Sequence, residues 1–262
     1  MKSIWLTCLL MIFAVSCAHK KKEEKPSYSP LITFQEGPSR FESKISLPKD
    51  FKDKVPLVIV VHEWWGRTPY ILNRAKMLNQ AGYAAMAVDL FGDNKTSDNP
   101  SDAQNLATPF YQNPEMGISR LKKYIEMASK DPHVNPHLIY VIGYCFGGTQ
   151  ALNLARSGAD VKGVVSFHGG LASKFPTMVN LKPKILVMTG TADPMVPAKD
   201  VKAFEKEMQS VNADFKIINY EGAKHAFTNP KATEIGKKYN IPIAYDKAAD
   251  EDSWLELLKF LR

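Results

Sequence analysis

The sequence predicts an α/β fold, a mostly parallel sheet with helices on both faces, in a single domain. From about Leu31 onward, apolar runs rich in β-branched residues alternate with amphipathic helical patterns, which is typical of βαβ units. The chain has 262 residues, of which 45% are hydrophobic and 23% charged. This composition supplies ample material for a core and excludes a disordered or collagen-like protein.

The predicted elements follow one another in a regular order. Residues 55–61 form a continuously apolar run, as expected of a strand buried on both faces. Thr68 and Pro69 then supply an N-cap and a first-turn proline, and Gly82 ends the predicted helix. Further strands are predicted at 83–90, 138–142, 161–167, 184–188 and 215–220, and further helices at 114–130, 149–155, 201–208 and 254–260.

The N-terminus differs in composition from the rest of the chain. Lys2 precedes an apolar run that is typical of a secretory signal peptide and shorter than the roughly 20 residues that span a bilayer. The run ends in Ala14-Val15-Ser16-Cys17, which resembles a bacterial lipobox with Cys17 as the lipidated residue. We therefore expect a signal peptide over 1–16, a lipid-anchored tether over 17–30 and a domain over 31–262. The alternative is a plain signal peptide.

The predicted location is the bacterial cell envelope, with the protein exported and held by the lipid at a periplasm-facing membrane. The formal net charge is +7, and one basic run lies at residues 20–25, beside the expected anchor. Basic residues near a membrane assist binding to anionic lipid. The other basic residues are scattered, so we expect no nucleic-acid partner. The sequence does not indicate an oligomeric state.

Cysteine usage singles out one thiol. The chain has three cysteines, Cys8, Cys17 and Cys145, without a CxxC pair or a Cys/His cluster. Neither a disulfide framework nor a zinc site is therefore predicted. If Cys8 is removed with the signal peptide and Cys17 carries lipid, Cys145 is the only free thiol.

Cys145 lies in the segment Gly143-Tyr144-Cys145-Phe146-Gly147-Gly148, between a predicted strand and a predicted helix. In a nucleophile elbow, glycines near the nucleophile avoid side-chain clashes in a tight turn. Such a turn places the thiol at a helix N-terminus, where the helix dipole favours the thiolate. Glycine-flanked cysteines also occur in plain loops, so this segment alone does not decide between the two interpretations.

Two later segments offer an acid and a base. Asp193 follows the strand predicted at 184–188, and His225 follows the strand predicted at 215–220. Taken alone, Asp193 before a proline is a common turn former, and His225 an ordinary loop histidine. Nucleophile, acid and base in this order, each beyond a strand, follow the α/β-hydrolase arrangement. Together they predict a Cys-His-Asp triad.

Several motifs in collinear order resemble the dienelactone hydrolase family of α/β-hydrolases. They are His62-Glu63-Trp64-Trp65-Gly66, Asp89-Leu90-Phe91-Gly92, Gly143 to Gly148, Gly190 to Pro197 and Gly222 to Phe227. The cysteine at the elbow and the His-Glu segment separate this family from ordinary esterases. The resemblance implies an α/β-hydrolase fold and a hydrolase of small ester or lactone substrates. Triad chemistry needs no metal and no organic cofactor, so none is expected.

The resemblance also implies a role for each matching residue. Cys145 would be the nucleophile, His225 the general base and acid, and Asp193 the partner that orients His225. The backbone N–H groups of Trp64 and Phe146 would form the oxyanion hole. The substrate would be cleaved through a thioester acyl-enzyme.

Glu63 matches the family glutamate that contacts the thiol in the resting enzyme. A carboxylate beside a thiolate is repelled by it, so we expect Glu63 to oppose ionisation of the thiol until substrate displaces it. The alternative for Glu63 is a solvated loop carboxylate.

The substrate pocket is less well defined by the sequence. Trp65 and Tyr70, with Trp64, form an aromatic wall or pack in the core, and His168 lines the pocket or is structural. In family members that act on dienelactone, an arginine follows the catalytic histidine by four residues, where this chain has Asn229. An amide cannot make a charge-assisted bidentate pair, so carboxylate recognition does not follow from the resemblance.

The segment 230–252 forms either a lid or an edge over the site. Two other functions are compatible with the same residues. One is an acyl transferase or peptidase that uses the same triad. The other is a lipoprotein that binds a ligand without turnover. The presence of nucleophile, acid and base together favours the hydrolase.

Overall fold

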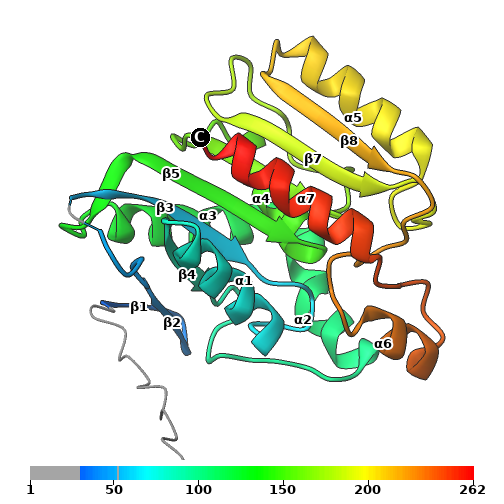
Figure 1. Cartoon of the computed structure of the whole chain (residues 1–262), viewed down its shortest axis with the longest axis horizontal. Helices are drawn as coiled ribbons and strands as arrows, with labels where there is room; N and C mark the ends of the chain where they lie inside the picture. Colours follow the sequence, from blue (N-terminus) through cyan, green and yellow to red (C-terminus); the bar gives the residue numbers. More distant parts are fainter. Residues whose placement is uncertain (1–29, 52) are drawn as a thin grey trace, which may run out of the picture.

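A computed structural model describes residues 30–51 and 53–262. The expected signal peptide, Cys17 and all of the expected tether except Pro30 lie outside the described residues. The centre of the fold is a six-stranded sheet with the order β4-β3-β5-β6-β7-β8 (Figure 1). Every neighbouring pair in it is parallel. The strands are β3 (Val55–Val61), β4 (Ala84–Val88), β5 (Val134–Tyr144), β6 (Gly163–Phe167), β7 (Lys184–Gly190) and β8 (Phe215–Tyr220).

Helices cover both faces of this sheet, which confirms the predicted α/β class. Helices α1 (Pro69–Gln80) and α7 (Lys247–Phe260) pack on one face. The other face is covered by α2 (Pro100–Gln112), α3 (Pro114–Ala128), α4 (Phe146–Arg156) and α5 (Ala198–Ser210). A short helix, α6 (Ala232–Tyr239), lies beyond the carboxyl ends of the strands (Figure 1).

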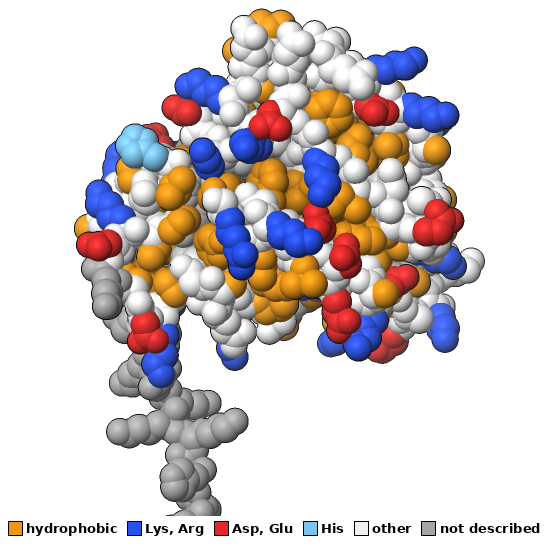
Figure 2. All heavy atoms as spheres, turned by 45° about the horizontal axis from the view of Figure 1, so that its top comes forward, with side chains coloured by type: hydrophobic (Ala, Val, Ile, Leu, Met, Phe, Trp, Pro, Cys, Tyr) orange, Lys and Arg blue, Asp and Glu red, His pale blue; other side chains and the backbone are white. Residues whose placement is uncertain are grey.

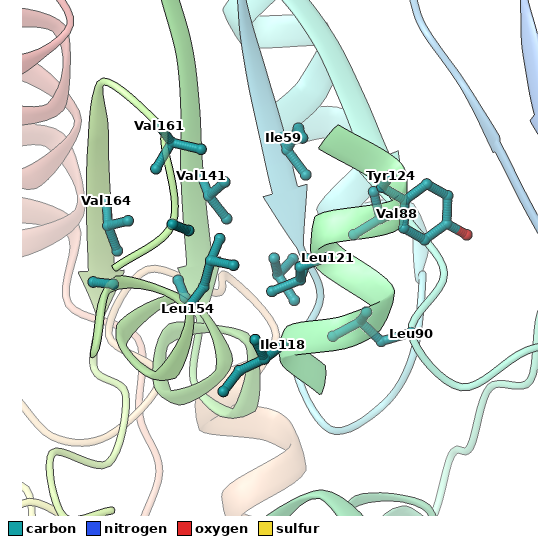
Figure 3. Packing of buried hydrophobic residues seen from close by; sticks show 14 of the residues in the cluster. Ile59, Val88, Leu90, Ile118, Leu121, Tyr124, Val141, Leu154, Val161 and Val164 are labelled. Atoms are coloured by element: carbon teal, nitrogen blue, oxygen red, sulfur yellow. The ribbon is translucent and has the colours of Figure 1, made fainter. Parts of the chain in front are cut away.

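Alternation along β3 explains why the sheet is buried on both faces. Leu57, Ile59 and Val61 pack under α3 and α4, whereas Val58 and Val60 face α1. Figure 3 shows the first of these cores, with side chains from the sheet meeting those of α3 and α4. Burial of β-branched side chains on both faces gives the continuous apolar run seen in the sequence.

A two-stranded antiparallel hairpin precedes the sheet and was not predicted. It consists of β1 (Leu31–Glu36) and β2 (Ser39–Lys44). The chain then joins the main sheet at Ser46, whose N–H and C=O both bond to Ala85, at 2.8 and 2.9 Å. Only alternate hairpin residues, such as Phe34 and Phe41, are buried. The apolar signal is therefore too sparse to distinguish these strands from a loop.

The structure also corrects several predicted boundaries. Helix α2 was not predicted, although Asn99 caps it by accepting from the N–H of Asp102 at 2.9 Å. Strand β5 begins at Val134 rather than residue 138. Helix α7 begins at Lys247 rather than residue 254, because the Asp246 side chain caps it.

The surface and the helices bear on possible partners. On the face shown in Figure 2, Lys and Arg side chains are interspersed with Asp and Glu rather than gathered in one patch. This one face therefore shows no basic stripe of the kind that nucleic-acid interfaces have. Within the described part of the chain, no helix has the length and apolar character needed to cross a membrane.

The start of α4 packs so closely on the end of β3 that only glycine fits. A Cβ at Gly147 would lie 2.4 Å from the Val61 carbonyl oxygen and 2.6 Å from that of His62. We expect Gly147→Ala to lower the free energy of unfolding by about 1–3 kcal/mol, as overpacking typically does. Urea unfolding measures the change.

The control is Gly170→Ala, because its added Cβ would meet only the Thr149 side chain, at 3.3 Å. It should change the free energy of unfolding by less than about 1 kcal/mol. Equal urea midpoints for the two variants would contradict the proposed backbone clash.

Candidate active site

The turn that carries Cys145 joins β5 directly to α4. Cys145 has φ 54° and ψ −117°, a backbone conformation that residues other than glycine rarely adopt. A Cβ at Gly143 would lie 2.0 Å from the Gly147 carbonyl oxygen, so the turn closes only with glycine there. Cys145 is partly exposed and is the free cysteine of the described residues. The sequence pattern thus corresponds to a strained strand-to-helix turn that presents a thiol.

The predicted acid and base meet at the same edge of the sheet, because the carboxyl ends of parallel strands lie together. Asp193 follows β7 and His225 follows β8. His225 Nδ1 lies 2.8 Å from Asp193 Oδ2, and both side chains are buried. The other carboxylate oxygen, Oδ1, accepts from the Met195 N–H at 2.8 Å. This arrangement fixes the His225 ring with Nδ1 as the donor to Asp193.

The remaining ring nitrogen, Nε2, is buried and has no hydrogen-bond partner among the described residues. His225 and Cys145 line one cavity. Burial lowers the pKa of His225, but the negative charges of the Cys145 thiolate and the Asp193 carboxylate outweigh it and raise the pKa to about 10. A negative charge on Cys145 therefore favours the protonated form of His225.

Trp64 and Phe146 line the same cavity as Cys145. Within the described part of the chain, the backbone N–H groups of these two residues have no hydrogen-bond acceptor. Phe146 is the first residue of α4, so its N–H has no acceptor within the helix. The helix dipole adds partial positive charge at the same point.

His62 holds the loop that carries Trp64. Its Nδ1 donates to the Glu63 carbonyl at 2.6 Å, and its Nε2 accepts from the Leu90 N–H at 3.2 Å. Burial lowers the pKa of His62 to about 4, so the ring is neutral at pH 7 and can make both bonds. His62 thus ties this loop to the end of β4.

Glu63 is buried, with 1% of its surface exposed. Its Oε2 accepts from Asn229 Nδ2 at 2.8 Å. No hydrogen bond joins Glu63 to Cys145 in the described structure, so the contact implied by the family resemblance is replaced by one to Asn229. Burial raises the pKa of Glu63 to about 7, against the opposing effects of Asn229, His225 and Arg74. The alternative of a solvated loop carboxylate is therefore wrong.

The cavity over Cys145 has a volume of about 370 Å³. Of the residues predicted for the pocket, Trp65 lines it together with Trp64. The centroids of these two indole rings lie 4.8 Å apart in an edge-to-face arrangement. Tyr70 and Asn229 instead line a neighbouring cavity of about 570 Å³, which shares Glu63 and Trp65 with the first. Within the described residues, no group of three His, Cys, Asp or Glu side chains could hold a metal ion.

Several lining residues were missed by the sequence reasoning. They are Gln104 and Tyr111 of α2, Met195 and Asp200 around the start of α5, and Ile243. The first two could have been found, because Asn99-Pro100 is a helix N-cap followed by a first-turn proline. The others depend on loop paths that have no local signal.

The segment 230–252 forms an edge of the site. The Ala244 N–H donates to the His225 carbonyl at 3.1 Å, and the Asp246 N–H to that of Phe227 at 3.0 Å. These bonds hold the chain around Ile243, which lines the cavity, beside the His225 loop. Tyr239 at the end of α6 donates to the Asp98 carbonyl at 2.6 Å, which connects α6 to the loop before α2.

His168 lies behind Cys145 rather than in the pocket wall, so of the two alternatives for this residue the structural one holds and the pocket position does not. It is completely buried and does not line the cavity. The Cys145 N–H is directed at both the Phe167 carbonyl, at 2.9 Å, and His168 Nδ1, at 3.1 Å. Nδ1 accepts and is therefore unprotonated, so Nε2 is the donor to Thr228 Oγ1, at 2.7 Å.

A buried polar network continues from Thr228 to α7. The Tyr70 hydroxyl lies 2.7 Å from Thr228 Oγ1, and Arg74 Nη2 donates to the Thr228 carbonyl at 2.6 Å. Arg74 also forms a buried ion pair with Asp250. The network joins the Cys145 turn to the His225 loop, because Thr228 is only three residues beyond His225.

The raised pKa of Glu63 predicts a pH-dependent effect of Glu63→Gln. Ionising the buried carboxylate costs the folded protein free energy between pH 4.5 and about 7. Glu63→Gln should therefore become more stable than the wild type as the pH rises through this window, by at most about 3 kcal/mol above it. Urea unfolding at pH 4.5 and pH 8 tests this. An equal difference at both pH values would contradict a buried, ionising Glu63.

Burial and the charges of His225 and Arg74 hold the pKa of His168 well below its ordinary 6.5. Below that pH the unfolded chain takes up a proton that the folded protein excludes. The free energy of unfolding of the wild type should therefore fall relative to that of His168→Asn as the pH decreases. Asn keeps an acceptor for the Cys145 N–H and tolerates the positive φ at this position.

His168→Ala is the matched comparison, because it removes both hydrogen bonds and should cost about 1–3 kcal/mol more than Asn at pH 7. Urea unfolding from pH 5 to 8 gives both values. If the difference in free energy of unfolding between the wild type and His168→Asn does not vary with pH, His168 is not held neutral in the folded state.

Comparison with known proteins identifies the family. The chain matches the model of the dienelactone hydrolase family over residues 41–262. Protein usf of Aquifex pyrophilus is 26% identical over 237 residues, which cover 88% of this chain and 97% of that protein. A putative carboxymethylenebutenolidase of Aquifex aeolicus is 25% identical over 210 residues, 78% of this chain and 89% of that protein.

A solved structure shows the same fold. The crystal structure of a dienelactone hydrolase-like promiscuous phosphotriesterase from metagenomic libraries aligns with a TM-score of 0.81 and 27% identity. The alignment covers 89% of this chain and 97% of that one. With the α/β-hydrolase fold and the family match over the whole sheet, the chain belongs to the dienelactone hydrolase family and is an ester or lactone hydrolase.

Proposed function

We propose that this protein hydrolyses esters or lactones with a Cys145–His225–Asp193 triad through a thioester acyl-enzyme. One observation supports this most directly. His225 is bound to Asp193 at 2.8 Å, and its unpartnered Nε2 belongs to the cavity that Cys145 lines. A base oriented by an acid beside a nucleophile is the arrangement that nucleophilic catalysis requires.

In the first half-reaction the Cys145 thiolate attacks the carbonyl carbon, and the carbonyl electron pair moves onto oxygen. The N–H groups of Trp64 and Phe146 stabilise that oxyanion. When the tetrahedral intermediate collapses, the C–O bond breaks and the His225 imidazolium protonates the departing alkoxide. A thioester remains on Cys145. Loss of one oxyanion donor typically costs about 10²–10³ in rate.

In the second half-reaction His225 is neutral and accepts a proton from water. The resulting hydroxide attacks the thioester carbon, and the same two N–H groups stabilise the second oxyanion. Collapse expels the Cys145 thiolate and releases the carboxylic acid. Asp193 stabilises the imidazolium in both steps without taking up its proton.

Glu63 keeps a proton-accepting carboxyl group at the edge of the nucleophile's cavity, held by Asn229. With a pKa of about 7 it is partly protonated at neutral pH, which limits its repulsion of the thiolate. In this proposal Glu63 tunes the Cys145 thiol and takes no part in bond cleavage.

We further propose, from the N-terminal sequence, that the protein is exported and tethered to a membrane of the cell envelope by lipid on Cys17. The lipobox-like Ala14-Val15-Ser16-Cys17 and the basic run at 20–25 support this. A tether of this kind would place the hydrolase outside the cytoplasm.

The triad is tested with 4-nitrophenyl acetate, 4-nitrophenyl butyrate and γ-lactones. Cys145→Ala should lower kcat/KM by about 10³-fold or more, since the nucleophile is lost. His225→Asn should cause a comparable loss, whereas His137→Asn, on an exposed histidine outside the cavity, should not. Intact-mass spectrometry after rapid acid quenching should show one acyl group in the wild type and none in Cys145→Ala.

The outcomes separate the alternatives. Product formation only when an amine or alcohol acceptor is added would indicate an acyl transferase. Cleavage of peptide amides in preference to all the esters would indicate a peptidase. Turnover of none of these compounds, with no acyl group on Cys145, would leave a ligand-binding lipoprotein.

A further inference from the structure

The charge of the cavity over Cys145 points to the class of acyl group that it accepts. Among the described residues that line it there is no Lys and no Arg. Two of the lining residues carry carboxyl groups, Glu63 and Asp200. His225 is the one lining residue that can carry a positive charge, and the negative charges of Cys145 and Asp193 beside it offset that charge. Outside this group, the described lining residues offer a substrate anion no cation.

Asp200 is the more exposed of the two carboxylates. It lies in the first turn of α5 and is partly accessible to solvent. Its carboxylate has no hydrogen-bond or ion-pair partner among the described residues. It therefore places a negative charge without an ion-pair partner at the cavity wall, where it repels an anion bound nearby.

The cations of neighbouring elements do not compensate for this charge. Arg74 is 4% exposed and is bound to Asp250 and to the Thr228 carbonyl. Lys231 and Lys238 line the neighbouring cavity on the other side of Glu63 and Trp65. Arg74 is therefore already paired, and the two lysines line a different cavity, so none of the three lines the cavity that would hold a substrate carboxylate near Cys145.

The rest of the wall is mostly apolar and aromatic. Beside Trp64 and Trp65 it includes Tyr111, Leu171, Met195 and Ile243. A cavity of about 370 Å³ with such a lining suits a small apolar group, because apolar burial favours binding in proportion to area.

We propose that this enzyme selects esters or lactones with an uncharged, apolar acyl group and discriminates against substrates with a carboxylate on that group. The inference rests on the proposed function and specifies its substrate class. It sets this chain apart from relatives named carboxymethylenebutenolidase, a name that specifies a carboxyl group on the lactone. Asp200 is the residue that most directly excludes that group.

Matched esters test the proposal. Methyl 4-nitrophenyl adipate and mono-4-nitrophenyl adipate share the same scissile ester and chain length, and at the far end of the acyl chain one carries a neutral methyl ester and the other a carboxylate. At pH 8 and low salt, kcat/KM should be about 10- to 100-fold higher for the methyl ester, the range expected for one unfavourable charge contact. The ratio should fall as salt is added. Equal rates, or faster hydrolysis of the anionic ester, would overturn the proposal.

Variants of Asp200 assign the effect to one residue. Asp200→Asn should lower the ratio, and Asp200→Lys should lower it further by accelerating hydrolysis of the anionic ester. Glu205→Lys is the control, because it makes the same charge change on the same helix at an exposed position outside the cavity. If Glu205→Lys lowers the ratio as much as Asp200→Lys, the discrimination comes from net charge and not from the cavity wall.

Alkylation of Cys145 tests the charge selectivity of the cavity independently of ester hydrolysis. The ratio of the rates with iodoacetate and iodoacetamide reports how the cavity treats a negative charge near the sulfur. Asp200→Lys should raise this ratio at least about fivefold over the wild type, whereas Glu205→Lys should not. If no ester is hydrolysed but this shift is seen, the proposed function fails and the charge selectivity stands. If esters are hydrolysed without the shift, the selectivity fails alone.

Discussion

The single backbone turn at Cys145 is the constraint on which the rest of the site depends. A non-glycine residue at φ 54° is unfavourable and persists only where its surroundings fix it. Here the surroundings are the Phe167 carbonyl and His168, which both face the Cys145 N–H, and Gly147 packed against the end of β3. The same turn aims the thiol into the cavity and starts the helix whose first N–H remains free.

Buried histidines with different protonation states support this turn. His62 and His168 are kept neutral by burial, and each uses one ring nitrogen as a donor and the other as an acceptor. His225 is equally buried, but Asp193 and the thiolate favour its charged form. Burial alone therefore does not decide the charge of a histidine in this site. The neighbouring anions do, and they favour the charged form of His225, the residue that transfers protons in the proposed mechanism.

The carboxyl groups of the site divide into two kinds. Asp193 is bound to His225 and to a backbone N–H, as the proposed triad requires. Glu63 and Asp200 line the cavity, and neither forms an ion pair with a Lys or Arg of the described residues. On the proposed selectivity, this imbalance disfavours an anionic acyl group even though the proposed reaction itself generates an oxyanion. In that mechanism the oxyanion is stabilised by backbone N–H groups, which act at short range and do not attract a distant carboxylate.

The α/β class, the strands of the central sheet, and Cys145, Asp193 and His225 as candidates for one triad could all be predicted from the amino-acid sequence alone. These follow from local signals, namely apolar periodicity, glycines in a tight turn, and chain order relative to strands. The β1–β2 hairpin, the place of His168 behind the turn, the Asn229–Glu63 hydrogen bond and the unpaired carboxylate of Asp200 at the cavity wall became clear only from the tertiary structure. Each depends on which distant segments pack together, and a side chain's burial and partners are properties of that packing.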